Sequence, residues 1–274
     1  MIIDFHIHLT KGDYRPWVLD LIEHFQRVDG LDLQKINSMT REKMEAYLTQ
    51  EGVDTAVILA EVCPITTGIF GNDEVAEFCR GSKRLIPFAS INPHMVSRPG
   101  HELRRLVAEL GFRGLKLYPS YQQYYPNDNQ IYPIYSVAEA LQIPVMVHTG
   151  SSLFRGARLK YGDPVHLDDV AVDFPNLTII LAHSGRGIWY QNAVLLSQLH
   201  QNVYLEISGL PPKNLLRYLP DMERNAEKVI FGTDWPVVPG IRYNIEELMK
   251  LQLSQEAKEK ILGGNAARLL KLRN

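Results

Sequence analysis

The sequence lacks most features that would assign it to a specialised structural class. It has only two cysteines in 274 residues, Cys63 and Cys79, too few and too unevenly spaced for a disulfide framework or a zinc–thiolate site. No apolar run approaches the roughly 18 residues of a membrane helix, and no basic region followed by an apolar segment opens the chain. We therefore expect reduced, structural cysteines in a cytoplasmic protein without a membrane partner.

An excess of charge of one sign is also missing. The chain has 29 Lys and Arg residues against 31 Asp and Glu residues, a formal net charge of -2, and no run of like charges. This balance argues against nucleic acid as a partner. A hydrophobic content of 45% is ordinary for a folded chain with a sizeable core, in one large domain or two small ones.

Eight short apolar segments recur along the chain, with helical patterns between them. Most are rich in Val, Ile and Leu, which is typical of parallel strands covered by helices. This alternation within one domain length favours the α/β class and a single-domain (β/α)8 TIM barrel over an open doubly wound sheet. No Gly-x-Gly-x-x-Gly follows the first segment, so dinucleotide binding loses support. The predicted strands are residues 1–8, 54–62, 84–93, 114–119, 143–150, 177–185, 203–209 and 228–236.

One long segment departs from the alternation within the expected domain of residues 1–274. Residues 9–45 separate the first strand from a helix expected around TREKMEAYLTQEG, and they include the stretch YRPWVLDLIEHF. We expect this insertion to form helix and loop over the barrel mouth. There it would act as a lid that excludes water.

Polar side chains gather at predicted strand ends. In MIIDFHIH, Asp4, His6 and His8 alternate with apolar residues and so share one face of the strand. The active sites of TIM barrels lie at the carboxyl ends of the strands. Three later strands also end in a polar residue: His148, His183 and Asp234.

Imidazoles and a carboxylate suit a divalent ion, with zinc, iron, manganese, cobalt and nickel all admissible. One such histidine alone would be an ordinary core residue, so the prediction rests on their joint placement.

The ordered motifs resemble those of the amidohydrolase superfamily, and within it the amidohydrolase-2 group that includes aminocarboxymuconate-semialdehyde decarboxylase. The similar stretches are DFHIH, GFRGLKLYP, PVMVHTG, FPNLTIILAHSG, VYLEISG, VIFGTDWPV and ILGGNAARLL. The resemblance implies one divalent metal ion, with zinc as the expected ion. The ligands that it implies are His6, His8, His148 and Asp234, and it makes His183 a catalytic residue near the metal.

Lys116 is the ambiguous position of this resemblance. In some branches of the superfamily a lysine at the end of the fourth strand is carboxylated and bridges two metals, so a second ion would follow if Lys116 were carboxylated. We expect one ion, with Lys116 as a pocket residue. The TatD nucleases share the His-x-His and the late aspartate, but they imply an acidic ligand near the middle strands, where this chain has Lys116.

These residues predict a metal-dependent hydrolase of an amide, lactone or related ester of a small carboxylate-bearing substrate. A bound ion lowers the pKa of coordinated water towards about 7. Asp234 would carry the proton, and His183 would polarise the oxygen that becomes negative. The alternative is a metal-dependent, non-oxidative decarboxylase of an unsaturated or aromatic acid, which the ligands do not distinguish. A catalytically inactive metal- or ligand-binding barrel is a third hypothesis, against which the presence of both Asp234 and His183 argues.

Candidates for substrate binding follow the strand ends. Arg186, three residues beyond His183, is the expected partner of a substrate carboxylate, whereas Arg155 and Arg158 are expected at the surface. Further candidates line an expected aromatic pocket: Lys116, Tyr118 and Trp235.

Two carboxylates, Asp4 and Glu206, face inward by strand parity. We expect them either to hold metal-binding imidazoles or to cap buried backbone groups. The expected partner is a small molecule, and the expected assembly is a homodimer.

Overall fold

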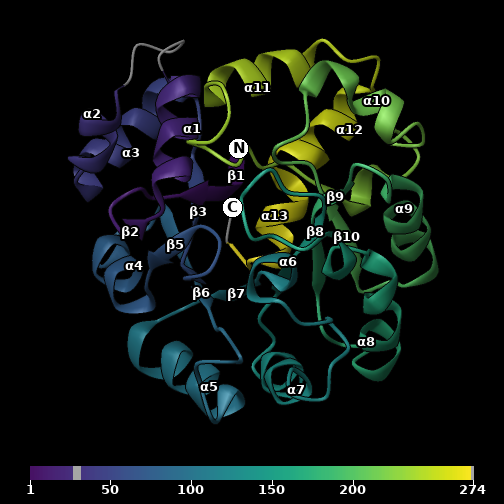
Figure 1. Ribbon diagram of the computed structural model, residues 1–274. Coiled ribbons are helices and arrows are strands. Elements are labelled where there is room, and N and C mark those ends of the chain that lie inside the picture. The colour runs from purple at the N-terminus through teal and green to yellow at the C-terminus, as the bar shows by residue number, and fades with distance from the viewer. Residues whose placement is uncertain (27–31, 273–274) are drawn as a thin grey trace.

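The computed structural model describes residues 1–26 and 32–272, and its eight parallel strands form a nearly closed barrel with helices between them (Figure 1). The order of the strands around the barrel is their order in the chain. The predicted (β/α)8 TIM barrel is therefore confirmed, and each predicted strand overlaps one barrel strand. The barrel strands are β1 (Ile3–His8), β3 (Thr55–Leu59), β6 (Leu85–Ser90), β7 (Gly114–Leu117), β8 (Val145–Gly150), β9 (Ile179–Arg186), β10 (Val203–Glu206) and β11 (Val229–Ile230).

The two edges of the sheet meet between β1 and the segment that follows β11. The backbone N–H of His8 donates to the carbonyl of Trp235 at 2.9 Å, and the N–H of Asp234 donates to the carbonyl of His6 at 2.9 Å. A parallel bridge between Ile7 and Trp235 lies in the same place. Closure of the barrel thus sets Asp234 beside the two histidines of β1.

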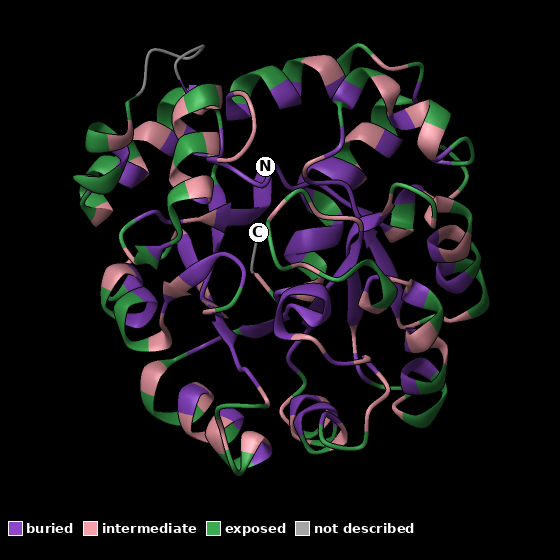
Figure 2. Cartoon of the chain, viewed as in Figure 1, coloured by how far each residue is buried: buried purple, intermediate pink, exposed green. Residues whose placement is uncertain are grey.

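The interior of the barrel has its own apolar core. Phe5 and Phe88 meet edge to face inside it, with ring centroids 5.4 Å apart. Gly114 makes room for the Phe88 ring, because a Cβ there would lie 2.3 Å from its Cζ. A second, larger core lies between the strands and the surrounding helices. In Figure 2 the buried strands are purple and the outer faces of the helices are green.

One helix predicted by its sequence, TREKMEAYLTQEG, lies where expected. It begins after the N-cap Thr40 and ends at Gly52, whose φ of 83° suits glycine. Among the described residues, no helix combines the length and apolarity needed to span a bilayer. From residue 41 on, the α-helices are α3 (Arg41–Glu51), α4 (Asn72–Cys79), α5 (Pro99–Leu110), α6 (Pro119–Gln122), α7 (Tyr132–Ala140), α8 (Leu167–Asp173), α9 (Tyr190–Leu199), α10 (Leu215–Tyr218), α11 (Ile241–Met249), α12 (Gln255–Glu259) and α13 (Asn265–Leu269).

The insertion predicted over residues 9–45 contains β2 (Asp13–Tyr14), α1 (Pro16–Gln26) and α2 (Leu33–Asn37). Its residues 27–31 lie outside the described part of the chain. The short strand β2 pairs with β5 (Gly68–Phe70), which pairs in turn with β4 (Glu61–Cys63), in an antiparallel sheet that the sequence did not predict. The insertion is thereby joined to the loop that follows β3.

The buried side chain of Gln26 joins the helix α1 to the segment that follows β11. The Gln26 amide donates to the carbonyls of Pro236 at 2.6 Å and Val238 at 2.9 Å. These acceptors follow Asp234 directly in the chain. The role of this segment as a water-excluding lid stays a prediction.

Candidate metal centre

Three predicted ligands converge where the barrel closes. His6 Nε2 and His8 Nε2 lie 3.2 Å apart, and Asp234 Oδ1 lies 3.4 Å from the first and 3.5 Å from the second. Strand parity places the two imidazoles on one side of β1, and the bonds between β1 and the segment after β11 bring the carboxylate to them. One ligand atom from each residue lies within 4.8 Å of the others, a grouping that could hold one metal ion.

The fourth predicted ligand, His148, lines the same cavity from β8. Its Nε2 is buried and has no hydrogen-bond partner among the described residues. A buried polar nitrogen left in this state is costly, because it has lost its water and gained nothing in return. A cation among the imidazoles would satisfy it, so His148 fits a divalent ion in donor type and lines the same cavity, while the ligand atoms that lie within 4.8 Å of one another are those of His6, His8 and Asp234.

The surroundings of His6 and His148 favour the neutral imidazole that metals bind, whereas those of His8 favour the protonated form. Burial lowers the pKa of His6 and of His148 well below the ordinary histidine value, and the ammonium of Lys116 lowers both further. Burial also lowers that of His8, but hydrogen bonds to Asp234 and Glu61 outweigh it and raise its pKa to about 9. A bound metal ion would replace the proton of His8 as the positive charge between the carboxylates of Asp234 and Glu61.

Asp234 keeps its negative charge in this environment. Burial raises its pKa, but the charges of His6, His8 and Arg186 together with the hydrogen bond from His8 bring it below the ordinary aspartate value. A carboxylate at neutral pH can both bind a cation and accept a proton.

Glu206 and Ser208 form a polar layer beneath the histidines. Glu206 Oε2 accepts hydrogen bonds from Ser208 Oγ at 2.8 Å and from the His183 N–H at 3.2 Å, and it lies 3.3 Å from His6 Nδ1. Ser208 Oγ lies 2.8 Å from His6 Nδ1 and 3.0 Å from His183 Nδ1. Partners of this kind fix the orientation and tautomer of an imidazole, the first of the two roles expected of Glu206. The sequence analysis did not single out Ser208.

Asp4 takes the other expected role and caps backbone groups. It accepts from the Thr233 hydroxyl at 2.6 Å, the Thr233 N–H at 3.0 Å and the His6 N–H at 3.1 Å. Burial raises the pKa of Asp4 to about 7 despite these bonds. Asp4 therefore ties β1 to the residue before Asp234 and supports the metal ligands only through the backbone.

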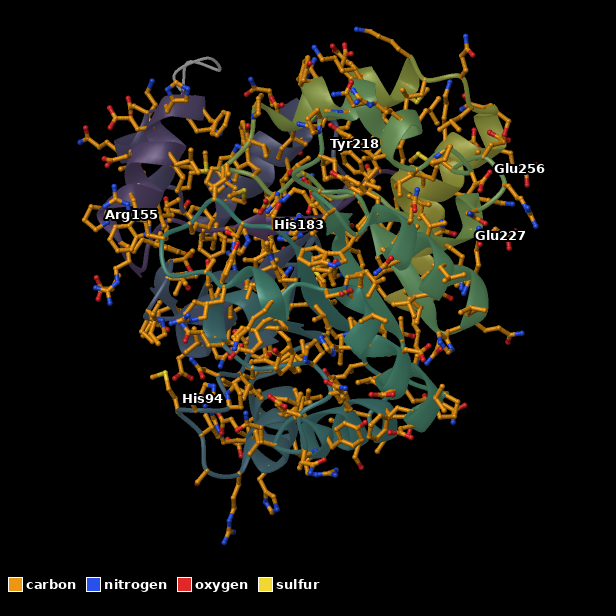
Figure 3. The ribbon with its side chains drawn as sticks, turned by 45° about the vertical axis from the view of Figure 1, so that its right-hand side comes forward. His94, Arg155, His183, Tyr218, Glu227 and Glu256 are labelled. Carbon is orange, nitrogen blue, oxygen red and sulfur yellow. The ribbon has the colours of Figure 1, made fainter. Side chains whose placement is uncertain are left out.

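His183 lies at the centre of the barrel, whereas His94 and Arg155 lie at the periphery (Figure 3). Its Nδ1 is 2.9 Å from the carbonyl of Ser208, and its ring centroid is 4.8 Å from that of His148. His183 and Asp234 both adopt left-handed backbone conformations, with φ of 64° and 73°. Such conformations are costly for residues with a Cβ and cluster at functional sites.

Lys116 is fully buried on β7 and lines the small cavity. Its Nζ lies 3.3 Å from Met146 Sδ and 5.3 Å from the centroid of the Tyr118 ring. Burial lowers its pKa to about 8. Glu61, which lines the same cavity, approaches His8 Nδ1 to 3.4 Å through Oε2. The sequence analysis missed this carboxylate because the predicted second strand ran through it.

Two cavities meet above the ligands. The inner one, about 30 Å³, holds the ligands, and the outer one, about 320 Å³, opens beside them. Asp234, Phe154 and Val237 line both. Arg186 lines the outer cavity: its Nε and Nη2 donate to the Ser151 carbonyl at 3.1 and 3.0 Å, and its Nη1 lies 4.0 Å from Asp234 Oδ2.

The aromatic candidates lie differently from what the sequence suggested. The Tyr118 ring lines the inner cavity, but its hydroxyl donates to the Ala60 carbonyl at 2.8 Å. The prediction that Trp235 lines the substrate pocket is wrong. Its side chain is fully buried against Tyr47, with ring centroids 5.3 Å apart, and lies outside the walls of both cavities. Its backbone closes the barrel, and this turns the side chain outward from the site. Arg155 and Arg158 are exposed, as expected.

Gly209 is a further residue that the sequence analysis did not single out. Its φ is 63°, and a Cβ there would lie 2.6 Å from Arg186 Nη1 and 3.0 Å from Asp234 Oδ2. We expect Gly209→Ala to displace both groups and to lower kcat/KM about 10²-fold, because displacements near 1 Å cost about that much. Steady-state kinetics would test this, with Gly111→Ala as the control, since Gly111 also has a positive φ but nothing within 4 Å. Equal activity of the two variants would contradict it.

Comparisons with known proteins show the family of the chain. The amidohydrolase family model matches residues 3–272. The chain is 27% identical over 252 residues to a γ-resorcylate decarboxylase from Rhodococcus jostii, covering 73% of this chain and 75% of that protein. It is 25% identical to a 2-amino-3-carboxymuconate-6-semialdehyde decarboxylase from Dictyostelium discoideum, covering 98% of this chain and 91% of that protein.

Solved structures share the fold. An uncharacterised TIM-barrel protein from Bordetella bronchiseptica superposes with a TM-score of 0.82 at 26% identity, covering 98% of each chain. A dihydroxybenzoic acid decarboxylase from a Polaromonas species, with bound manganese and 2-nitroresorcinol, gives 0.69 at 20% identity over 100% and 97%. A probable 2-pyrone-4,6-dicarboxylic acid hydrolase from Acinetobacter baumannii gives 0.72 at 16% identity over 99% of each.

Proposed function

The chain belongs to the amidohydrolase-2 group of the amidohydrolase superfamily, and from this premise we propose that it is a metal-dependent, non-oxidative decarboxylase of a small hydroxylated or unsaturated carboxylic acid. The observation that carries the proposal is the position of Asp234, which belongs to the ligand cluster and also lines the acid-sized cavity beside Arg186. The curated relatives favour decarboxylation over the hydrolysis that the sequence analysis put first. The neighbour named as a probable hydrolase shares only the fold at 16% identity.

The metal would be held by His6, His8, His148 and Asp234. When bound, a divalent ion would orient the oxygen atoms of the substrate and stabilise negative charge on them. Manganese in the Polaromonas decarboxylase supports a divalent ion of this kind. Zinc as the preferred ion of this chain stays a prediction from the sequence.

The side chains supply binding and proton transfer. The free edge of Arg186 pairs with the substrate carboxylate. Asp234, a carboxylate at the start, accepts the proton of a substrate hydroxyl and delivers it to the carbon that bears the carboxylate. A C–H bond forms there, the C–C bond to the carboxylate breaks, its electron pair returns to the unsaturated system, and carbon dioxide leaves. The substrate oxygen finally regains a proton from solvent.

His183 would position a hydroxyl of the substrate. Its Nδ1 faces the Ser208 carbonyl, which accepts only, so Nδ1 carries the proton and Nε2 is the acceptor. In this tautomer Nε2 accepts a hydrogen bond from a second hydroxyl of the substrate, because the proton of the first goes to Asp234. The sequence analysis had instead assigned it to polarise a negative oxygen.

Isotope incorporation tests the proposed reaction. The enzyme, loaded with manganese or zinc, is incubated in D2O with 2,6-dihydroxybenzoate, the acid bound by one structural relative, and with a panel of unsaturated acids and lactones. We expect release of carbon dioxide and one deuterium, seen by NMR, at the carbon that lost the carboxylate. Lactone opening without carbon dioxide would establish the hydrolase instead. Bound metal with no turnover of any compound would favour the inactive barrel.

A further inference from the structure

We propose that the outer cavity selects a monocarboxylic acid whose far end is uncharged and rich in hydrocarbon, and that it rejects acids with a second carboxylate there. The inference rests on the proposed function, because it takes the reacting carboxylate to lie at the Arg186 and Asp234 end. It concerns the opposite end of the substrate, whose chemical character follows neither from the relatives nor from the metal-ligand residues.

The cavity offers positive charge for one carboxylate only. Among the described residues that line it, Arg186 is the sole cationic side chain. Two of its nitrogens already donate to the Ser151 carbonyl, which leaves Nη1 on the side of Asp234. Gly209 keeps that edge open, since a Cβ there would contact Nη1. The charged end of the cavity is therefore narrow and fixed.

The remaining walls are almost entirely apolar. They come from α1 and from the loops that follow β8, β10 and β11: Leu21, Phe25, Leu153, Leu210, Val237 and Val238. The Asn244 amide nitrogen, at the far wall, is held by the carbonyls of Pro239 and Gly240 at 2.9 Å each. Tyr243 also lines the cavity. A second carboxylate would lose its water here and meet no cation.

The loop after β8, which supplies Leu153 and Phe154 to the cavity wall, also contacts α1. Arg155, two residues beyond Leu153, lies over the Trp17 ring of α1 at 5.6 Å, and the Trp17 Nε1 donates to the Thr66 carbonyl at 2.9 Å. In Figure 3 Arg155 lies beside α1 at the edge of the molecule. The guanidinium of Arg155 is thus held outside the cavity, although its neighbours Leu153 and Phe154 line it.

Size agrees with an apolar substituent on the substrate. A volume of about 320 Å³ is at the lower end of the range for small-molecule sites. Each methylene buried against such walls strengthens binding about fourfold. A three-carbon chain at the far end should therefore improve binding at least about tenfold, and a carboxylate in its place should weaken it.

Binding of unreactive acids tests the inference separately from turnover. Benzoate, 4-propylbenzoate and terephthalate are titrated calorimetrically into the metal-loaded enzyme. We expect 4-propylbenzoate to bind at least about tenfold more tightly than benzoate, and terephthalate more weakly than benzoate. This order is independent of decarboxylation, so the proposed reaction could fail while the selectivity stands.

One exposed wall residue provides matched variants. Leu153 is 86% exposed, so its substitution leaves the core intact. Leu153→Arg should improve terephthalate binding and weaken that of 4-propylbenzoate, whereas Leu153→Gln should leave terephthalate unimproved. The inference is overturned if terephthalate binds the wild type as tightly as 4-propylbenzoate, if the propyl group brings no gain, or if none of the three acids binds.

Discussion

Replacement of Asp234 by asparagine is expected to lower kcat for decarboxylation about 10³-fold while the barrel stays folded. The amide cannot take up and release a proton at neutral pH, and loss of such a group costs 10²- to 10⁴-fold. Its Oδ1 can still occupy the position between His6 and His8, so part of the bound metal should remain. Product formation under substrate saturation and metal content by mass spectrometry measure the two effects separately.

The matched control is Asp73→Asn, which changes an exposed aspartate in the first turn of α4. It should leave kcat and metal content unchanged. If Asp234→Asn kept wild-type turnover with metal bound, the proton would come from another group and the assignment of Asp234 would be wrong. If turnover and metal fell together to the same extent, Asp234 would be a ligand whose role as proton carrier is not separable from binding.

The first strand shows why so much of this site was predictable from sequence. The placement of His6 and His8 on one side of β1 is a local property of extended backbone and needs no knowledge of the fold. The prediction that Asp4 shares this side is wrong, because the register shifts between Asp4 and Ile7, and Ile3 and Phe5 belong to the interior core while Ile7 belongs to the outer one. The rule that TIM-barrel sites lie at carboxyl strand ends then adds residues from strands distant in sequence. Both steps require only that the strands be recognised in the sequence, and each predicted strand is present in the barrel. The structure accordingly places His6, His8, His148, His183 and Asp234 around one cavity.

Other site residues carry no comparable signal. Ser208 and Gly209 follow β10 as an ordinary Ser-Gly pair, and they matter only because the ends of β9 and β11 approach them. Glu61 lies in β4, beyond the barrel strand with which it was grouped. Trp235 faces away from the site because its backbone closes the barrel onto β1. These outcomes depend on tertiary approach, which periodicity and spacing do not encode.

The size of the outer cavity was equally beyond the sequence. Its walls come from segments that are far apart in the sequence, and the contribution of α1 depends on where Gln26 attaches that helix. The insertion was recognised by its length, but neither its pairing with β5 nor its attachment to the loop after β11 follows from the pattern. Substrate selectivity is therefore a property that the structure adds.

Removal of a histidine ligand is expected to lower the metal content of the protein strongly. We expect the purified wild-type chain to hold about one divalent ion, and His8→Ala and His148→Ala to lose at least about 90% of it, because a site of four ligands binds far more weakly with three. His94→Ala, which removes an exposed imidazole at the periphery, should retain the wild-type amount. Elemental analysis by mass spectrometry gives metal per chain directly.

The wild-type value also decides how many ions the site holds. A value near two would make Lys116, buried beside the ligands, a carboxylated bridge and would overturn the single-ion prediction. Retention of metal by His148→Ala would instead show that its unpartnered Nε2 is satisfied by water, so that His6, His8 and Asp234 suffice. No metal in the wild type, even after dialysis against zinc and manganese, would leave these histidines as core residues, because only a bound cation gives their convergence a chemical function.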